Sequence, residues 1–108
     1  MYQSEPIVDH QANVSPETFA IVQDGMVAMA SSTTMLSNFM ENGITLAGKT
    51  GTAQELNDRP DHALFTGYTN VEDPDVTVTV VIPFGGGSSR AIDTFVKLAG
   101  AYYAVEVE

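Results

Sequence analysis

The sequence predicts an α+β fold, in which an antiparallel three-stranded sheet is flanked by an N-terminal and a C-terminal helix. Apolar residues recur at helical spacing near both ends of the chain, and residues 77–82 show the alternation of a half-buried strand. An acidic turn at residues 72–75 precedes this strand, which favours an antiparallel hairpin. With 108 residues, the chain has the size of one domain. We therefore treat residues 1–108 as a single unit that opens with an irregular leading segment, residues 1–14.

Composition excludes several classes of function. The chain has 14 acidic and 4 basic residues and a net charge of −10. Its surface therefore repels phosphate backbones and anionic lipids, so we expect no nucleic-acid partner. The absence of cysteine excludes disulfides, thiol catalysis and thiolate metal sites. His10 and His62 are isolated from each other, and we expect neither a metal nor a cofactor. The chain shows no signal peptide and no membrane-spanning run.

The first predicted element is a helix over residues 16–30. Ser15 can accept a hydrogen bond from a free backbone N–H at its start, and Pro16 suits the first helical position. One apolar stripe follows at helical spacing: Phe19, Val22, Met26 and Met29. A short helical turn is predicted over residues 35–40.

A sheet and a last helix follow this helical region. Aromatic and β-branched residues predict three strands: residues 44–53, 63–70 and 77–82. A polar loop covers residues 55–62. The last helix can be capped by Ser88 or Ser89, and one amphipathic stripe marks it: Ile92, Phe95, Val96, Ala99, Tyr102 and Tyr103. We expect both helices to lie on the sheet face opposite solvent or a partner.

The glycine-rich segment from Gly43 to Thr52 is the part of the chain most suited to chemistry. Residues 43–50 match the phosphate-loop pattern G-x-x-x-x-G-K-[ST]. Such a loop must follow a buried strand and open a helix, so that backbone N–H groups face the phosphates. Residues 44–47 are instead typical of a strand, and Gly51 is a poor second residue for a helix. The context therefore argues against nucleotide binding.

A second interpretation of this segment rests on a longer tract. Residues 46–54 read LAGKTGTAQ, residues 62–69 read HALFTGYT, and the valine-rich strand and the last helix come after them. In this order the segments resemble the penicillin-binding proteins, the serine transpeptidases that cross-link peptidoglycan, over roughly residues 15–104. Their K-T-G element is one of three motifs, beside S-x-x-K and S-x-N. The resemblance implies that the chain is the C-terminal part of such a transpeptidase domain.

The resemblance also implies a role for each residue of the K-T-G-T segment, Lys49 to Thr52. Lys49, Thr50 and Thr52 would bind the terminal carboxylate of a peptidoglycan stem peptide or of a β-lactam. The backbone amide of Thr52 would donate to the oxyanion, so Lys49 and Thr52 are the predicted catalytic residues. Gly51 would let the peptide lie close to the strand. Ideal pleating, however, places Thr50 and Thr52 on one face and Lys49 and Gly51 on the other.

The two other motifs of the family are absent from this chain. Neither lysine has a serine three positions before it, and no serine has an asparagine two positions after it. We therefore expect the isolated chain to be inactive, to need the N-terminal part of the domain as a partner, and to self-associate through the surface that this part would cover. By resemblance, the parent protein acts at the extracytoplasmic face of the cell membrane. The alternative is a stand-alone α+β interaction module without acyl transfer.

Overall fold

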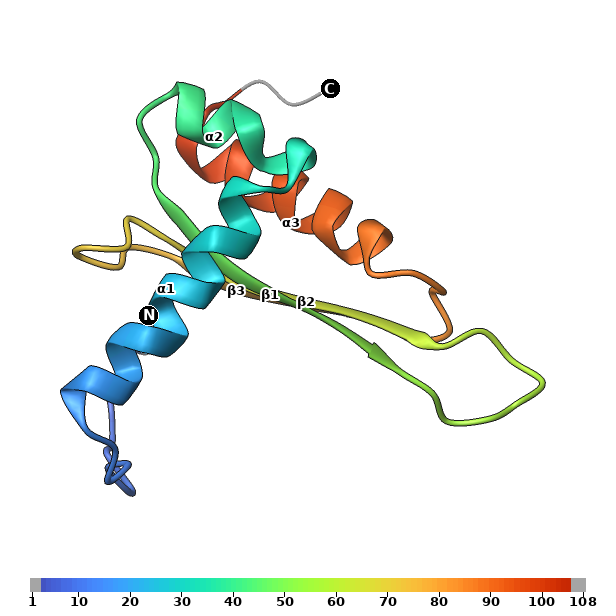
Figure 1. Ribbon diagram of the computed structural model, residues 1–108, viewed down its shortest axis with the longest axis horizontal. Helices are drawn as coiled ribbons and strands as arrows, with labels where there is room; N and C mark the ends of the chain where they lie inside the picture. Colours follow the sequence, from blue (N-terminus) through green and yellow to red (C-terminus); the bar gives the residue numbers. More distant parts are fainter. Residues whose placement is uncertain (1–2, 106–108) are drawn as a thin grey trace.

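The computed structural model describes residues 3–105 and confirms the α+β class with one antiparallel three-stranded sheet (Figure 1). Its elements are α1 (Pro16–Ser31), the 3₁₀ helix η1 (Thr34–Leu36), α2 (Ser37–Glu41), β1 (Leu46–Ala53), β2 (His62–Thr69), β3 (Thr77–Ile82) and α3 (Ser89–Tyr103). Residues 3–15 form no helix or strand, and residues 1–2 of the predicted irregular segment lie outside the described part. Within residues 3–105, no helix is long and apolar enough to cross a membrane.

The helix starts show where local sequence determines structure. The hydroxyl of Ser15 accepts a hydrogen bond from the backbone N–H of Thr18 at 3.2 Å, and Pro16 is the first residue of α1, both as predicted. Elements η1 and α2 confirm the short helical turn. The predicted cap of α3 is wrong, because the Ser88 side chain makes no capping hydrogen bond. There the first turn is closed by the backbone, with Ile92 N–H donating to Ser88 C=O at 3.0 Å.

The sheet has the order β1-β2-β3, and both pairings are antiparallel. Phe65 lies at its centre, directly opposite Thr50 on β1 and Val80 on β3. Strand β1 begins at Leu46 rather than at residue 44. The reason is that Ile44 donates its N–H to the carbonyl of Phe39 at 2.9 Å and so still belongs to the end of α2. Strands β1 and β3 are the outer strands of the sheet within the described residues.

The main core lies between the sheet and α3. The Phe65 ring meets the Phe95 ring edge to face, with centroids 4.9 Å apart, and Phe39 of α2 packs on the far side of Phe95 at 6.3 Å. The alternation predicted for β3 is confirmed, since Val78, Val80 and Ile82 all pack into this core. Its buried members are Ala30, Leu36, Phe39, Leu46, Ala63, Phe65, Val80, Ala91, Ile92, Phe95, Val96 and Ala99.

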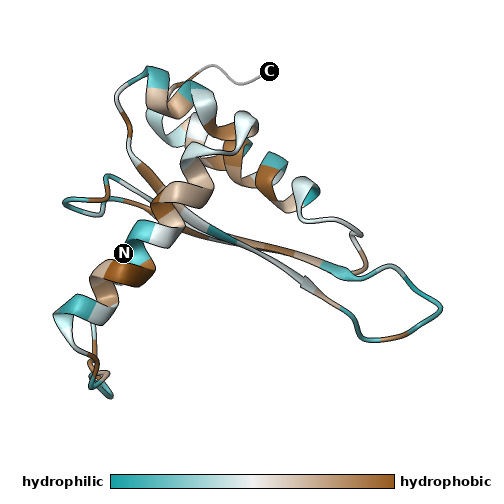
Figure 2. Ribbon diagram, viewed as in Figure 1, coloured by the Kyte–Doolittle hydropathy of each residue, from teal (hydrophilic) through white to brown (hydrophobic). Residues whose placement is uncertain are grey.

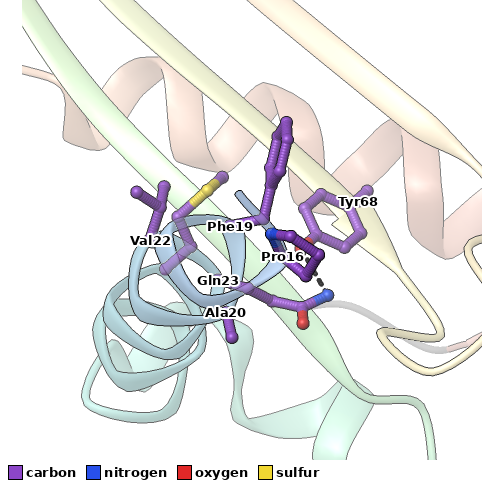
Figure 3. Close-up of a pocket in the computed structure, with 7 residues that line it drawn as sticks. Pro16, Phe19, Ala20, Val22, Gln23 and Tyr68 are labelled. Carbon is purple, nitrogen blue, oxygen red and sulfur yellow. Dashed lines mark hydrogen bonds between the residues drawn. The ribbon is translucent and has the colours of Figure 1, made fainter. Parts of the chain in front are cut away.

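The two long helices contact opposite faces of the sheet, so the expectation of a shared face is wrong. Tyr68 and Thr69 are neighbours on β2 and therefore point to opposite faces. The Tyr68 hydroxyl accepts a hydrogen bond from Gln23 of α1 at 3.1 Å, whereas the Thr69 hydroxyl lies 2.6 Å from the Tyr103 hydroxyl of α3. Figure 3 shows α1 in front of the strands and α3 behind them. Helical periodicity identifies the apolar side of a helix but not the sheet face that it covers.

Helix α1 is most buried in its C-terminal part. Ala30 is its one buried residue, while Phe19 and Val22 of the predicted stripe are 55% and 56% exposed. Figure 2 shows a brown, apolar turn in the N-terminal half of α1, which stands away from α2 and α3. The stripe predicted from the sequence is therefore present as a pattern, but half of it faces outward.

A hydrogen-bond network ties the end of α3 to the β2–β3 turn. The Tyr103 hydroxyl donates to Asp75 at 2.9 Å, lies 2.6 Å from the hydroxyl of fully buried Thr69, and accepts from Asn70 at 3.4 Å. Burial raises the pKa of Tyr103 above its usual 10.0; the hydrogen bond with Thr69 opposes this change, and that with Asp75 adds to it. The neutral phenol is therefore the form that the fold favours.

We expect Tyr103→Phe to lower the free energy of unfolding by about 1–2 kcal/mol at pH 7, because it leaves the buried Thr69 hydroxyl without its closest partner. The control is Tyr102→Phe, whose ring is 61% exposed. Since the folded-state pKa of Tyr103 lies above the unfolded value, its contribution is complete below pH 10 and is lost as the pH rises through the folded-state pKa. Urea unfolding between pH 7 and 11 measures both effects. A difference between wild type and Tyr103→Phe that stays constant above pH 10 would contradict the linkage.

Candidate functional site

The K-T-G-T segment lies on β1, at the edge of the sheet. Lys49, Thr50, Gly51 and Thr52 are all within this strand, and none lies in a loop. In an outer antiparallel strand, every second residue directs its backbone N–H and C=O away from the neighbouring strand. This edge of the sheet can therefore offer backbone hydrogen bonds to an extended ligand.

The register places the four residues on two faces, as ideal pleating predicts. Lys49 and Gly51 lie opposite Thr66 and Leu64 of β2, on the face that α1 contacts. Thr50 and Thr52 lie opposite Phe65 and Ala63, on the face that α3 covers. The structure thus brings the four residues to one edge but keeps their side chains in two alternating sets.

A hollow of about 240 Å³ joins most of the segment. It is lined by Lys49, Thr50, Gly51, Leu64, Phe65, Thr66 and Thr79. Thr52 is not among the lining residues. Two further hydroxyls do line it, and sequence reasoning did not identify them: those of Thr66 and Thr79, which lie 2.9 Å apart. The pairing of the strands places these two threonines near the site, because Thr66 lies directly opposite both Lys49 and Thr79.

Lys49 brings a positive charge to this edge. Its ammonium donates to the Thr50 carbonyl at 2.8 Å, and no carboxylate of residues 3–105 forms an ion pair with it. By contrast, Lys97 of α3, the second lysine of the chain, pairs with Asp93 at 2.7 Å. Because its charge is not neutralised within the described residues, Lys49 can attract a carboxylate ligand.

A pair of glycines, one on β1 and one on β2, makes room for the Phe65 ring next to the K-T-G-T segment. Gly48 and Gly67 lie directly opposite each other on β1 and β2, and the Phe65 ring covers both. A Cβ atom at Gly48 would lie 2.6 Å from Phe65 Cζ, and one at Gly67 would lie 2.9 Å from Phe65 Cε1. The ring therefore fills the space that two side chains would otherwise take, directly before Lys49.

A larger groove lies elsewhere on the α1 face of the sheet. It has a volume of about 530 Å³ and shares no lining residue with the hollow beside Lys49. Figure 3 shows its walls, formed by α1 on one side and Tyr68 on the other. The lining residues are Pro16, Phe19, Ala20, Val22, Gln23, Met26 and Tyr68. These side chains are mostly apolar and include no titratable group apart from the Tyr68 phenol, so we place the candidate site at the K-T-G-T segment.

Comparison with known proteins identifies the family of the chain. The family model of the penicillin binding protein transpeptidase domain matches residues 2–98. The chain belongs to this family. It is similar to the peptidoglycan D,D-transpeptidase PbpA of Mycolicibacterium smegmatis, with 36% identity over 76 residues, which is 68% of this chain and 15% of the relative.

Two solved transpeptidase structures share the fold of this family member. Penicillin-binding protein A of M. tuberculosis, in an imipenem acyl-enzyme complex, has a TM-score of 0.70, 26% identity, and coverage of 83% of this chain and 20% of the other. The D,D-transpeptidase domain of a peptidoglycan glycosyltransferase from Eggerthella lenta has a TM-score of 0.57, 31% identity, and coverage of 82% and 22%. This penicillin-binding protein chain therefore spans about a fifth of each of these structures, and it represents a part of a D,D-transpeptidase domain.

Proposed function

We propose that this chain supplies the carboxylate-binding and oxyanion-hole strand of a D,D-transpeptidase that cross-links peptidoglycan and binds penicillin. The observation that carries the proposal is the position of the K-T-G-T segment on an outer strand, with a lysine that no carboxylate of residues 3–105 neutralises. The similar proteins support the activity, since one is named a peptidoglycan D,D-transpeptidase and another holds imipenem as an acyl-enzyme.

Each residue of the segment takes a role that its position allows. Lys49 and Thr50, which line the same hollow, hold the terminal carboxylate of a stem peptide or β-lactam through a charge-assisted hydrogen bond and a hydroxyl. Thr52, which is exposed near the end of β1, adds its hydroxyl and directs its backbone N–H to the oxyanion formed when a serine attacks the amide. A Cβ atom at Gly51 would lie 3.2 Å from Leu64 Cβ, so the Leu64 side chain would have to give way slightly to a larger residue.

The partner of this chain in catalysis is the remainder of the transpeptidase domain, at the extracytoplasmic face of the cell membrane. The serine that attacks the substrate belongs to an S-x-x-K motif, which this chain does not contain. The exposed apolar half of α1, with Phe19, Ile21 and Val22, is suited to contact that remainder. Without it, the same surface favours self-association of the chain.

Labelling with fluorescent penicillin tests the proposal. We expect no covalent label on the chain alone, because it lacks the nucleophile, and a stable acyl-enzyme once the serine-bearing part of M. smegmatis PbpA is joined in front of residue 15. Gel fluorescence after denaturation measures the label. The control is the same fusion with its nucleophilic serine changed to alanine. No labelling of a fusion that folds would favour the alternative of a stand-alone interaction module, whereas labelling of the chain alone would show that it carries its own nucleophile and would contradict the proposal.

A further inference from the structure

His62 lies at the end of the sheet where the K-T-G-T strand stops. It is the first residue of β2 and lies directly opposite Ala53, one pair beyond Thr52 and Ala63. Its ring is mostly buried between two connecting segments, residues 54–61 between β1 and β2 and residues 83–88 between β3 and α3. The proposed roles of the K-T-G-T residues make no use of this histidine.

Both nitrogens of the His62 ring have partners, one in each segment. Nδ1 accepts a hydrogen bond from the backbone N–H of Phe84 at 3.0 Å, and Nε2 lies 2.8 Å from Oε2 of Glu55. A ring nitrogen that accepts from an N–H carries no proton itself, so the single proton of the neutral ring is on Nε2 and is donated to Glu55. The neutral form of His62 therefore satisfies both contacts at once.

The residue that His62 holds has an unusual backbone conformation. Phe84 has φ of 54°, in the left-handed region that large side chains rarely occupy. Its ring contacts the His62 ring in a tilted arrangement, with centroids 4.6 Å apart, and the Arg59 guanidinium lies 5.3 Å from the centroid of the Phe84 ring. A second link joins the same segments, since Gly86 N–H donates to Asp61 C=O at 2.9 Å. The hydrogen bond to His62 thus helps to hold Phe84 in a conformation that large side chains rarely occupy.

We propose that neutral His62 is a pH-dependent positioning residue, which fixes the end of β1 against the segment between β3 and α3. A second proton on Nδ1 turns the acceptor into a donor that faces the Phe84 N–H, so this hydrogen bond is lost while the contact with Glu55 remains. Acid therefore removes one of the contacts that hold residues 83–88, which keep the link from Gly86 to Asp61, and leaves the contact with Glu55 in place. A shift of Thr52, which directly precedes Ala53 on β1, would matter for acyl transfer and so rests on the proposed function, whereas the switch at Phe84 does not.

Charged groups lie close to the ring on the side of residues 54–61. The Glu55 carboxylate pairs with Nε2, and the Arg59 guanidinium lies over the Phe84 ring. Asp61 precedes His62 and contacts the other segment through its backbone carbonyl. Residues 83–88 contain no titratable side chain, and Ala53, the residue opposite on β1, is uncharged. The response to acid is therefore specific to the Phe84 hydrogen bond.

Amide hydrogen exchange of the chain between pH 5 and 8 tests this switch without any substrate. We expect the protection factor of the Phe84 amide, corrected for intrinsic exchange, to fall about fivefold or more on acidification, which corresponds to the loss of one hydrogen bond. The amides of Phe65 and Val80 in the sheet serve as an internal reference for the fold. Nitrogen chemical shifts of the His62 ring report the tautomer. A proton on Nδ1 at pH 8, or constant Phe84 protection, would overturn the proposal.

Two variants separate the two contacts of His62. His62→Asn keeps an acceptor near the position of Nδ1 and cannot titrate in this range, so we expect Phe84 protection that does not change with pH. His62→Gln places its amide near the position of Nε2, so we expect low Phe84 protection at every pH. Equal pH dependence in wild type and His62→Asn would contradict the role of His62. Because no labelling is involved, these results are independent of whether the chain forms part of a transpeptidase.

Discussion

Replacing Phe65 with alanine is expected to lower the free energy of unfolding of this chain by about 3–5 kcal/mol. The ring is 1% exposed, lies at the centre of β2 and packs edge to face against Phe95. It also covers Gly48 and Gly67, so its removal opens a cavity that small neighbours cannot fill. Urea unfolding followed by circular dichroism measures the change. A loss below about 1 kcal/mol would show that this core is not closely packed.

Gly48 provides the complementary test of the same packing. Gly48→Ala places a methyl group 2.6 Å from the Phe65 ring and is expected to cost about 1–3 kcal/mol. The cost should decrease when Phe65→Ala is also present, because the two changes compete for one space. Gly25→Ala is the matched control, since a Cβ atom there meets nothing within 4 Å and the helix gains stability. Strictly additive effects of Gly48→Ala and Phe65→Ala would contradict the argument.

In the fusion with the serine-bearing part of PbpA, Lys49→Ala is expected to slow penicillin acylation about 10- to 100-fold. The reason is the loss of the charge-assisted hydrogen bond that we propose for the carboxylate of the ligand. Lys97→Ala is the matched control, because it removes the other lysine of the chain, on an exposed turn of α3. Rates of fluorescent penicillin labelling measure both variants.

Thr50→Val completes this test of the proposed site. It keeps the shape of the side chain and removes only the hydroxyl at the hollow that Lys49 lines, so we expect slower acylation without loss of stability. If neither Lys49→Ala nor Thr50→Val changed the rate, the assignment of the K-T-G-T segment would have to be withdrawn. A loss of rate in Lys97→Ala of similar size would point to general electrostatics.

The parts of the fold predicted best are those set by short-range sequence. Residues 77–82 form β3 as expected, because strict alternation with a turn before it leaves little choice of structure. The start of α1 at Pro16 followed from its capping residues. The placement of α1 did not, since it depends on the contact of Gln23 with Tyr68, 45 residues further along the chain. Long-range contacts of this kind leave no trace in helical periodicity.

The sequence motif pointed to the candidate site, but it did not point to the residues that surround this site. Lys49 to Thr52 were assigned by resemblance, and this assignment stays a prediction; the structure places them on an outer strand of the sheet. Thr66 and Thr79 escaped notice because their place beside Lys49 arises from strand register, which requires both hairpins to be aligned first. His62 appeared to belong to a polar loop, yet its contacts with Glu55 and Phe84 join two segments that are distant in sequence.

The composition of β3 has a consequence for the behaviour of the chain in solution. This outer strand consists only of threonine, valine and isoleucine and carries neither a charge nor a proline to discourage pairing with another molecule. Repulsion between copies that each carry a net charge of −10 is then the main colloidal protection. Buffers near the isoelectric point of about 4.2, or with high salt, remove this protection. Dilute buffer at neutral pH is accordingly the condition in which concentrated samples should stay clear longest.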